Sequence, residues 1–217
     1  MKAEIRADGV HISGYVNVPG RESRPVLTPR GKVNEVIEQR AFQRALDRAE
    51  NIDLMLDHDR VIGSTAAGTL TAYEDEVGLR AEAVINDEDV IKGAKEGRLK
   101  GWSFNMFKVK DEVEQRADQL PLRRVKEFDM SEITLVMNKQ PVYSSMSLEV
   151  RADTEEEVEI RASQSQFIVT EKVERLETSI DPDGVIRQTE TTTQTEVKSV
   201  VDYSAYEDKI NSMKAGY

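Results

Sequence analysis

The chain has 217 residues, of which 38% are hydrophobic and 33% charged, which is enough for one core of ordinary size plus an appendage. Its formal net charge of −11 argues against nucleic acid or an anionic membrane as the main partner, because both require a basic footprint. The sequence has no cysteine, no stretch approaching the roughly 20 apolar residues of a membrane span, and no apolar signal-peptide region at its start. We therefore expect a soluble intracellular protein without disulfides or thiolate chemistry.

The first part of the chain predicts short strands and one helix. Residues 4–18 predict two strands and a turn, and residues 19–32, which hold three prolines, predict a loop. Residues 33–49 carry apolar side chains near helical spacing and predict a single amphipathic helix. Residues 52–56 predict a short buried strand that leads directly into His58.

The middle of the chain predicts a hairpin, a second helix and several strands. Residues 70–73 and 78–85 predict a hairpin around an acidic turn. Residues 87–99 predict a helix capped by the aspartate at its first position, and residues 102–110 predict a strand that carries Ser103. A polar loop is predicted at 111–121, followed by strands at 124–128, 133–137 and 143–150.

The composition changes after Arg151. An acidic run at 153–157 indicates a linker, which we place at 152–165 between a compact β-rich domain at 1–151 and a tail at 166–217. The tail predicts a long hairpin, residues 166–180 and 185–201, around the turn sequence Asp-Pro-Asp-Gly, with a short helix at 203–213. Because it has few large apolar residues, the tail is not expected to form its own core.

A tetrapeptide pattern, Glu-X-Arg-Ala, recurs without a fixed period. Coincidence in a chain rich in these residues is the simpler interpretation, and a marker of cleavage sites is the alternative. The copies lie at 4–7, 38–41, 114–117, 149–152 and 159–162.

Three side chains are candidates for nucleophilic chemistry. A hydroxyl nucleophile needs a base within hydrogen-bond reach, and the base needs a third group to orient it. His58 follows the buried strand and is the candidate base, while Ser103 lies between glycine and aromatic residues and is the candidate nucleophile. Glu132 enters an apolar strand, where a buried carboxylate needs a partner. Asp129 is the alternative carboxylate.

Each of these residues alone is also typical of a structural role. A histidine that caps a strand, a serine within a strand and a glutamate that begins one are all common. A metal site at Asp57, His58 and Asp59 is a weaker candidate, because adjacent side chains on a strand point to opposite faces and two histidines make a poor zinc site. His11 lies in an alternating strand and is expected to be structural.

The order of features resembles the prohead (capsid-maturation) serine proteases of tailed bacteriophages, which are distant relatives of the herpesvirus assembly proteases. The resemblance covers roughly residues 5–150 in the right order. Trp102 and Asn105 flank the serine where smaller or more regular residues are expected, and the segment 137–141 matches loosely. The stretches that carry the resemblance are 12–18 (opening strand), 40–46 (first helix), 54–59 with 62–63 and 78–79 (histidine block), 101–104 (serine block) and 132–136 (acidic block).

The resemblance implies a serine endopeptidase that needs no cofactor and no metal. Ser103 would be the nucleophile, His58 the general base and Glu132 the group that orients His58. The herpesvirus relatives use a second histidine as the third member, so His11 is a lower-ranked alternative. Those relatives also suggest that dimerisation matters, which makes a homo-oligomer an expectation.

The resemblance also implies substrates and a location. The substrates would be the major capsid protein with its scaffold or delta segment, and the protease itself, inside the assembling prohead in the host cytoplasm. The tail would be a propeptide or a scaffold- or capsid-binding element. We expect self-cleavage near the Glu-X-Arg-Ala copies at 149–152 and 159–162, which would release the tail.

The fold prediction is α+β: β-rich, a small antiparallel barrel surrounded by helices, with a C-terminal hairpin and helix appendage. Three other functions stay open. One is a catalytically inactive, protease-derived scaffolding or capsid assembly protein. Another is a β-rich phage structural or chaperone module unrelated to proteases, which predicts that Ser103 and His58 lie far apart. The third is a metal-dependent hydrolase.

Overall fold

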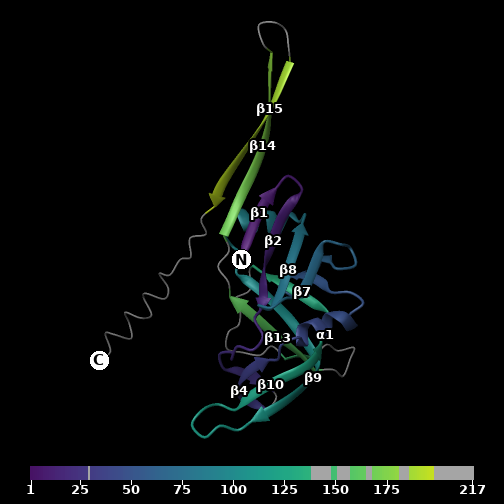
Figure 1. Cartoon of the computed structure of the whole chain (residues 1–217), viewed down its shortest axis with the longest axis vertical. Helices are drawn as coiled ribbons and strands as arrows, with labels where there is room; N and C mark the ends of the chain where they lie inside the picture. The colour runs from purple at the N-terminus through teal and green to yellow at the C-terminus, as the bar shows by residue number, and fades with distance from the viewer. Residues whose placement is uncertain (29, 138–147, 151–156, 165–167, 181–185, 198–217) are drawn as a thin grey trace, which may run out of the picture.

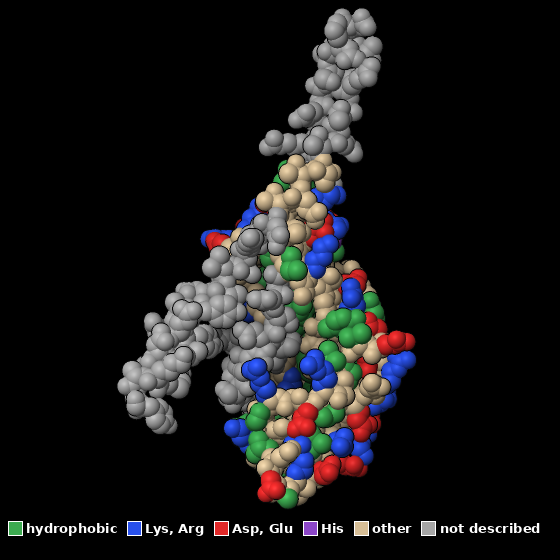
Figure 2. Space-filling view, turned by 60° about the vertical axis from the view of Figure 1, so that its left-hand side comes forward, with side chains coloured by type: hydrophobic (Ala, Val, Ile, Leu, Met, Phe, Trp, Pro, Cys, Tyr) green, Lys and Arg blue, Asp and Glu red, His purple; other side chains and the backbone are tan. Residues whose placement is uncertain are grey.

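The computed structural model describes the chain except residues 29, 138–147, 151–156, 165–167, 181–185 and 198–217. The described residues form two β-sheets and two short helices, which confirms a β-rich α+β fold. One cluster of buried side chains joins both sheets into a single core. None of the described helices is long and apolar enough to cross a membrane. On the face seen in Figure 2, acidic and basic side chains are interspersed over the body.

The first sheet has six strands among the described residues, in the order β15-β14-β1-β2-β8-β7. The hairpins β1–β2 and β7–β8 form as the sequence predicts, and the side chains of β7 and β8 alternate between more and less buried positions. The long β14–β15 hairpin extends beyond the body of the molecule, and β14 begins alongside β1 in parallel (Figure 1). The strands are β1 (Lys2–Arg6), β2 (Gly9–Asn17), β7 (Leu70–Glu74), β8 (Leu79–Ile85), β14 (Ile168–Ile180) and β15 (Ile186–Val197).

The second sheet is built around the 14-residue strand β9. Within the described residues its order is β3-β4-β10-β9-β11-β5-β6, with β13 paired to β9 and β12 paired to β13. β10 and β11 follow one another along one edge of β9, and β13 runs along the first half of the strand. The strands are β3 (Val26–Thr28), β4 (Gly31–Ile37), β5 (Asp53–Leu56), β6 (Arg60–Ser64), β9 (Gly101–Glu114), β10 (Leu122–Asp129), β11 (Glu132–Val136), β12 (Leu148–Val150) and β13 (Glu157–Gln164).

The two halves of β9 have different environments. Residues 101–106 are all buried, because β11 pairs with one edge and β13 with the other. Residues 107–114 alternate between more and less buried positions, as in a strand with one face toward solvent. The strand therefore continues into 111–114, where the sequence predicts a loop. Ser103 lies in the fully buried half.

The prediction of a single helix at 33–49 is wrong. Residues 31–37 form β4, which pairs in parallel with β10, and only α1 (Ala41–Arg48) is helical. The side chains of Val33, Glu35 and Ile37 are buried at alternate positions, a period of two that suits β-branched residues. Arg40, with a φ of 67°, ends the extended segment and starts the helix. The second helix, α2 (Glu88–Lys95), begins where it is predicted and is capped by Asp87, but it ends four residues before the predicted end at 99.

The predicted antiparallel barrel is not what the described residues form, since neither sheet closes on itself. Three strand pairs are parallel: β1 with β14, β4 with β10, and β5 with β11. An alternating pattern in a sequence does not distinguish parallel from antiparallel partners, so the mixed sheets were not foreseeable from it. The helices pack against different parts of the sheets, α1 on β10 and β7, and α2 on β1 and β2.

The linker predicted at 152–165 also differs from the structure, because residues 157–164 form β13. Its acidic residue Glu159 is only 5% exposed and is neutralised by arginines from elsewhere in the chain. The run of acidic residues suggested a solvated linker because Arg123, which binds Glu159, comes from a distant part of the sequence. The predicted strand at 143–150 is described only at Leu148–Val150, and the predicted helix at 203–213 lies outside the described residues.

Candidate active site

His58 lies in a tight turn at the end of β5. The strand is held in parallel alignment with β11, with Leu56 opposite Leu135. Asp57 and His58 then adopt left-handed backbone conformations, with φ of 51° and 61°. The Asp57 carboxylate accepts the main-chain N–H of Met137 at 2.7 Å and so fixes the turn to the end of β11. Two successive non-glycine residues in this region cost conformational energy, which is typical of a functional turn.

Ser103 and His58 lie within hydrogen-bond reach. The Ser103 Oγ is 2.9 Å from His58 Nε2. Ser103 is opposite Thr134 in the β9–β11 ladder, so both side chains lie on one face of the sheet, and His58 lies against that face. Thr134 Oγ1 is 3.1 Å from the other ring nitrogen, His58 Nδ1. The imidazole is therefore fixed between β9 and β11.

Glu132 completes a hydrogen-bonded series. His58 Nδ1 donates to Glu132 Oε1 at 2.6 Å, and the Glu132 residue is 3% exposed. When Nδ1 carries the proton, Nε2 is free to accept from the Ser103 hydroxyl. The structure thus brings together the three side chains singled out from the sequence, although Ser103 and Glu132 lie 45 and 74 residues after His58 along the chain.

Asn105 holds Glu132 in place and was not singled out as functional from the sequence. Its Oδ1 accepts the main-chain N–H groups of Ser131 and Glu132, at 3.0 and 3.2 Å. Its Nδ2 donates to Ser131 Oγ at 2.8 Å. Asn105 therefore bridges β9 to the short break between β10 and β11, which explains an amide at this buried position. The signal in the sequence was an amide between Phe104 and Met106, within the mostly apolar first half of β9.

An aromatic cluster supports the strand behind Ser103. The Phe42 ring from α1 makes edge contacts with Phe104 and Phe128, at centroid distances of 5.1 and 5.2 Å. All three rings are essentially inaccessible to solvent. Because Phe104 follows Ser103 directly and points to the opposite face, this packing fixes the backbone that carries the nucleophile candidate.

β13 covers the serine. Ala162 is opposite Ser103 in the β9–β13 ladder, and Ser103 is fully buried. The Ser103 hydroxyl donates to the main-chain oxygen of Arg161 at 2.9 Å. The Ser103 hydroxyl thus has two possible acceptors for its single proton, the Arg161 carbonyl oxygen and His58 Nε2. A side chain that lies this close to a main-chain carbonyl and to an imidazole has the components of acyl transfer.

A buried ion network anchors β13. Arg123 from β10 binds both carboxylate oxygens of Glu159, at 2.5 and 2.6 Å, and Arg161 binds both oxygens of Glu35, at 2.8 Å each. Arg123 also contacts Glu35 at 2.9 Å and the carboxylate of Asp111. Bidentate pairs of this kind fix both distance and orientation.

The pKa values in this network move toward the charged forms. Burial acts to raise the pKa of Glu159, but the hydrogen bond from Arg123 and the charge of Arg161 outweigh burial, so the pKa is lowered. Burial acts to lower the pKa of Arg161, and Glu35 and Glu159 outweigh it, so that pKa is raised. Glu159, Arg123 and Arg161 therefore hold their charges at neutral pH.

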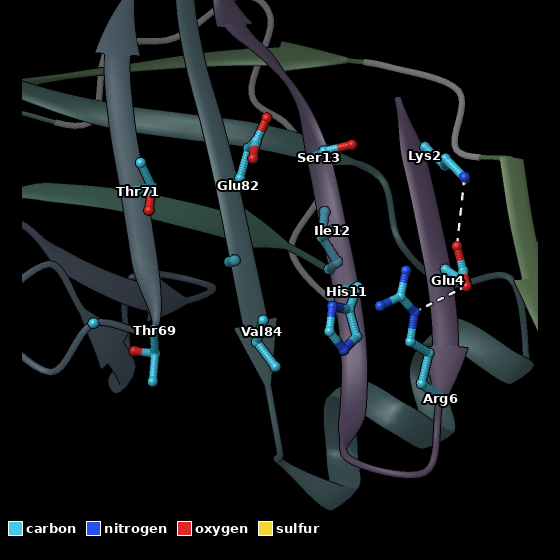
Figure 3. Close-up of a pocket in the computed structure, with 12 residues that line it drawn as sticks. Lys2, Glu4, Arg6, His11, Ile12, Ser13, Thr69, Thr71, Glu82 and Val84 are labelled. Atoms are coloured by element: carbon cyan, nitrogen blue, oxygen red, sulfur yellow. Dashed lines mark hydrogen bonds and ion pairs between the residues drawn. The ribbon is translucent and has the colours of Figure 1, made fainter.

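The weaker candidates lie elsewhere. His11 contacts Asp8 at 2.9 Å and lines a polar hollow on the first sheet (Figure 3), and Ser103 is not among the residues that line it. Asp129 pairs with Arg48 at 2.8 Å. Asp57 is committed to the main chain of Met137, and no group of three or more metal-binding side chains is found among the described residues.

A serine, a histidine and a carboxylate lie here in one hydrogen-bonded series, the arrangement that serine hydrolases use for nucleophile, base and orienting group. A family model described as caudovirus prohead serine protease matches residues 1–161. The chain belongs to this family, and the family is one of serine peptidases. Searches of curated proteins and of solved structures found no match to the chain.

Proposed function

We propose that the protein is a prohead maturation protease, a serine endopeptidase in which Ser103 is the nucleophile, His58 the general base and Glu132 the group that orients His58. The observation that carries this proposal is the hydrogen-bonded series from Glu132 through His58 to Ser103. In the first step His58 takes the Ser103 proton as Oγ attacks a peptide carbonyl. Water then releases the acyl group, with His58 again acting as base.

The substrates that we propose follow from the family. They are the major capsid protein with its scaffold or delta segment, and the chain itself, inside the assembling prohead in the host cytoplasm. The tail at 166–217 would be a propeptide or a capsid- or scaffold-binding element. A catalytically inactive scaffolding protein is not favoured, because loss of function would release the constraint that keeps these three side chains aligned.

Labelling with a fluorophosphonate tests the nucleophile and the base together. β13 covers Ser103 in the intact chain, so the probe reaches the serine only when β13 opens or has been cut away. We then expect covalent modification of Ser103 in the wild-type chain, located by peptide mapping, and none in Ser103→Ala. His58→Ala is expected to slow the modification by about 10³-fold or more, because the serine then lacks its base. His11→Ala replaces the only other histidine and is the matched control, with a rate like that of the wild type. Equal slowing by both histidine variants would contradict the assignment.

A further inference from the structure

β13 lies along β9 in the manner of a bound peptide substrate. The two strands are antiparallel, with Arg161 opposite Phe104 and Ala162 opposite Ser103. The Arg161 main-chain oxygen is 2.9 Å from Ser103 Oγ. Since a C=O bond is about 1.2 Å long, the Arg161 carbonyl carbon lies within roughly 4 Å of the same Oγ. For attack, the Arg161 carbonyl oxygen, which accepts from the Ser103 hydroxyl in this structure, has to turn away so that the carbon faces Oγ.

The side chains on this strand are held by complementary charges that are almost completely buried. The carboxylate of Glu35, from β4, binds the Arg161 guanidinium through both oxygens. The guanidinium of Arg123, from β10, binds the Glu159 carboxylate in the same way. Glu35 and Arg123 are each 3% exposed. A site built in this way discriminates strongly, because a substrate that lacks either charge leaves a buried charge short of its partner.

We propose that Arg161–Ala162 is the bond that the chain cleaves in itself, and that Glu35 and Arg123 are the residues that read the arginine and the glutamate before it. This inference rests on the proposed function. The substrate class is then a peptide with arginine immediately before the cleaved bond and an acidic residue two positions earlier. The tetrapeptide Glu-X-Arg-Ala at 159–162 meets this requirement.

The step balances with the groups at the site. Ser103 Oγ forms a bond to the Arg161 carbonyl carbon while its proton passes to His58 Nε2. The C–N bond to Ala162 then breaks, and the Ala162 amine leaves with that proton. Water hydrolyses the ester, which gives a carboxylate on Arg161 and restores Ser103.

The other copies of the tetrapeptide differ in their availability. The copy at 4–7 lies on β1, which is paired on both edges, by β2 and β14, and so is not free to enter the site. The copy at 149–152 has the same glutamate and arginine spacing as the one at 159–162. It is therefore the expected second cut once residues 162 onward have left the site.

The experiment follows the full-length chain by intact mass over time, in parallel with fluorophosphonate labelling of Ser103. The wild type is expected to yield an N-terminal fragment that ends at Arg161. Arg161→Leu should slow that cut at least about 100-fold, and Arg161→Lys, which keeps the charge but not the planar fork, by about tenfold. Arg6→Leu is the matched control, because it changes the equivalent arginine in the copy of the tetrapeptide at 4–7. In this variant the Arg161–Ala162 bond should be cut at the wild-type rate. A urea denaturation midpoint like that of the wild type shows that each variant is folded.

A Glu35→Gln background tests the reading residue. If Glu35 recognises Arg161, the two residues are coupled. The slowing of the cut by Arg161→Leu should then shrink from at least about 100-fold to about tenfold when Glu35 is replaced. An unchanged effect in that background would overturn the role of Glu35.

The outcomes separate this inference from the proposed function. A Ser103-dependent cut elsewhere, with Arg161–Ala162 intact, would overturn the inference and leave the protease standing. Labelling of Ser103 without any cut would also overturn it, while the nucleophile assignment survives. If Ser103 is neither labelled nor required for cutting, the proposed function fails and the inference falls with it.

Discussion

The side chain of Asn105 accepts the main-chain N–H of Glu132 at 3.2 Å, so a residue on the serine strand positions the carboxylate of the site. This contact links the placement of Ser103 and Glu132, since both depend on β9. The geometry of the site is therefore sensitive to a side chain that is not itself part of the proton-transfer series.

Replacing Asn105 by alanine should affect both stability and the site. The main-chain N–H groups of Ser131 and Glu132 lose their acceptor, which should lower the free energy of unfolding by about 1–3 kcal/mol. Glu132 should also become less well placed, so labelling of Ser103 should slow. Asn51→Ala is the control, because it removes another amide whose Oδ1 accepts a main-chain N–H, that of Ala66 at 3.0 Å, in a more exposed setting. Urea denaturation in a Ser103→Ala background measures the change in the free energy of unfolding. A wild-type labelling rate in Asn105→Ala would contradict the expected effect on the placement of Glu132.

Replacing Glu132 by glutamine tests the charge rather than the contact. An amide oxygen still accepts from His58 Nδ1, but it does not stabilise an imidazolium as a carboxylate does. We expect the rate of Ser103-dependent cleavage to fall by about 10⁴-fold with little change in stability. Glu127→Gln is the matched control, because Glu127 lies at the surface and pairs with Lys110. The assignment of Glu132 would be wrong if both variants cut at similar rates.

Phe42→Ala should be among the most destabilising single changes in the molecule. It removes a fully buried ring that contacts Phe104 and Phe128, and we expect a loss of about 3–5 kcal/mol in the free energy of unfolding. Phe107→Ala, at a half-buried position on the same strand as Phe104, should cost less than half as much. Denaturant titration in the Ser103→Ala background measures both, and equal losses would refute a special role for the cluster.

The docking of β13 should weaken in acid. The pKa of Glu159 in the folded chain lies below its ordinary value of 4.5, so its contribution to stability is fully present above that value. As the pH falls through the folded-state pKa, the carboxylate takes a proton and the contribution is lost. The groups that face Glu159 are Arg123 and Arg161, with Glu35 and Asp111 bound to the same arginines.

Hydrogen exchange at residues 157–164 of Ser103→Ala, corrected for the intrinsic rates at each pH, measures this docking. We expect high protection at pH 7 and a fall below pH 4.5, with Asp111 contributing because its pKa is also lowered, by Arg30 and Arg123 against the opposing effect of burial. Glu159→Gln should lower protection at pH 7 and flatten the acid response. Protection that stays constant down to pH 2 would contradict the role of the ion network.

The elements that the sequence predicts correctly are those with a strong local signal. The hairpins β1–β2 and β7–β8 have alternating apolar residues around turns, and α2 has Asp87 as its cap. The segment at 33–49 was misread because apolar residues at helical spacing there also satisfy a strand followed by a helix. Its true partner, β10, lies some 90 residues away in the sequence, and no local pattern encodes that pairing.

The candidate site shows the same division. His58, Ser103 and Glu132 each stood out by residue type and by a place next to a predicted strand, and the family resemblance put them in order. Asn105 was noted only as an irregularity, because its role depends on the break between β10 and β11. The burial of Glu159 depends on arginines that arrive from other strands, so the acidic segment was taken for a linker.

The parallel pairing of β14 with β1 decides what a cut after Arg161 would do to the molecule. In the intact chain the hairpin docks on Lys2–Ile5 as an intramolecular event, at an effective concentration in the range of about millimolar. After a cut the same contacts, including the Lys95–Glu171 ion pair, belong to two separate chains. Retention of the hairpin then follows mass action: it stays bound in a confined volume and dissociates on dilution. The severed chain would in this way respond to the size of the compartment that holds it.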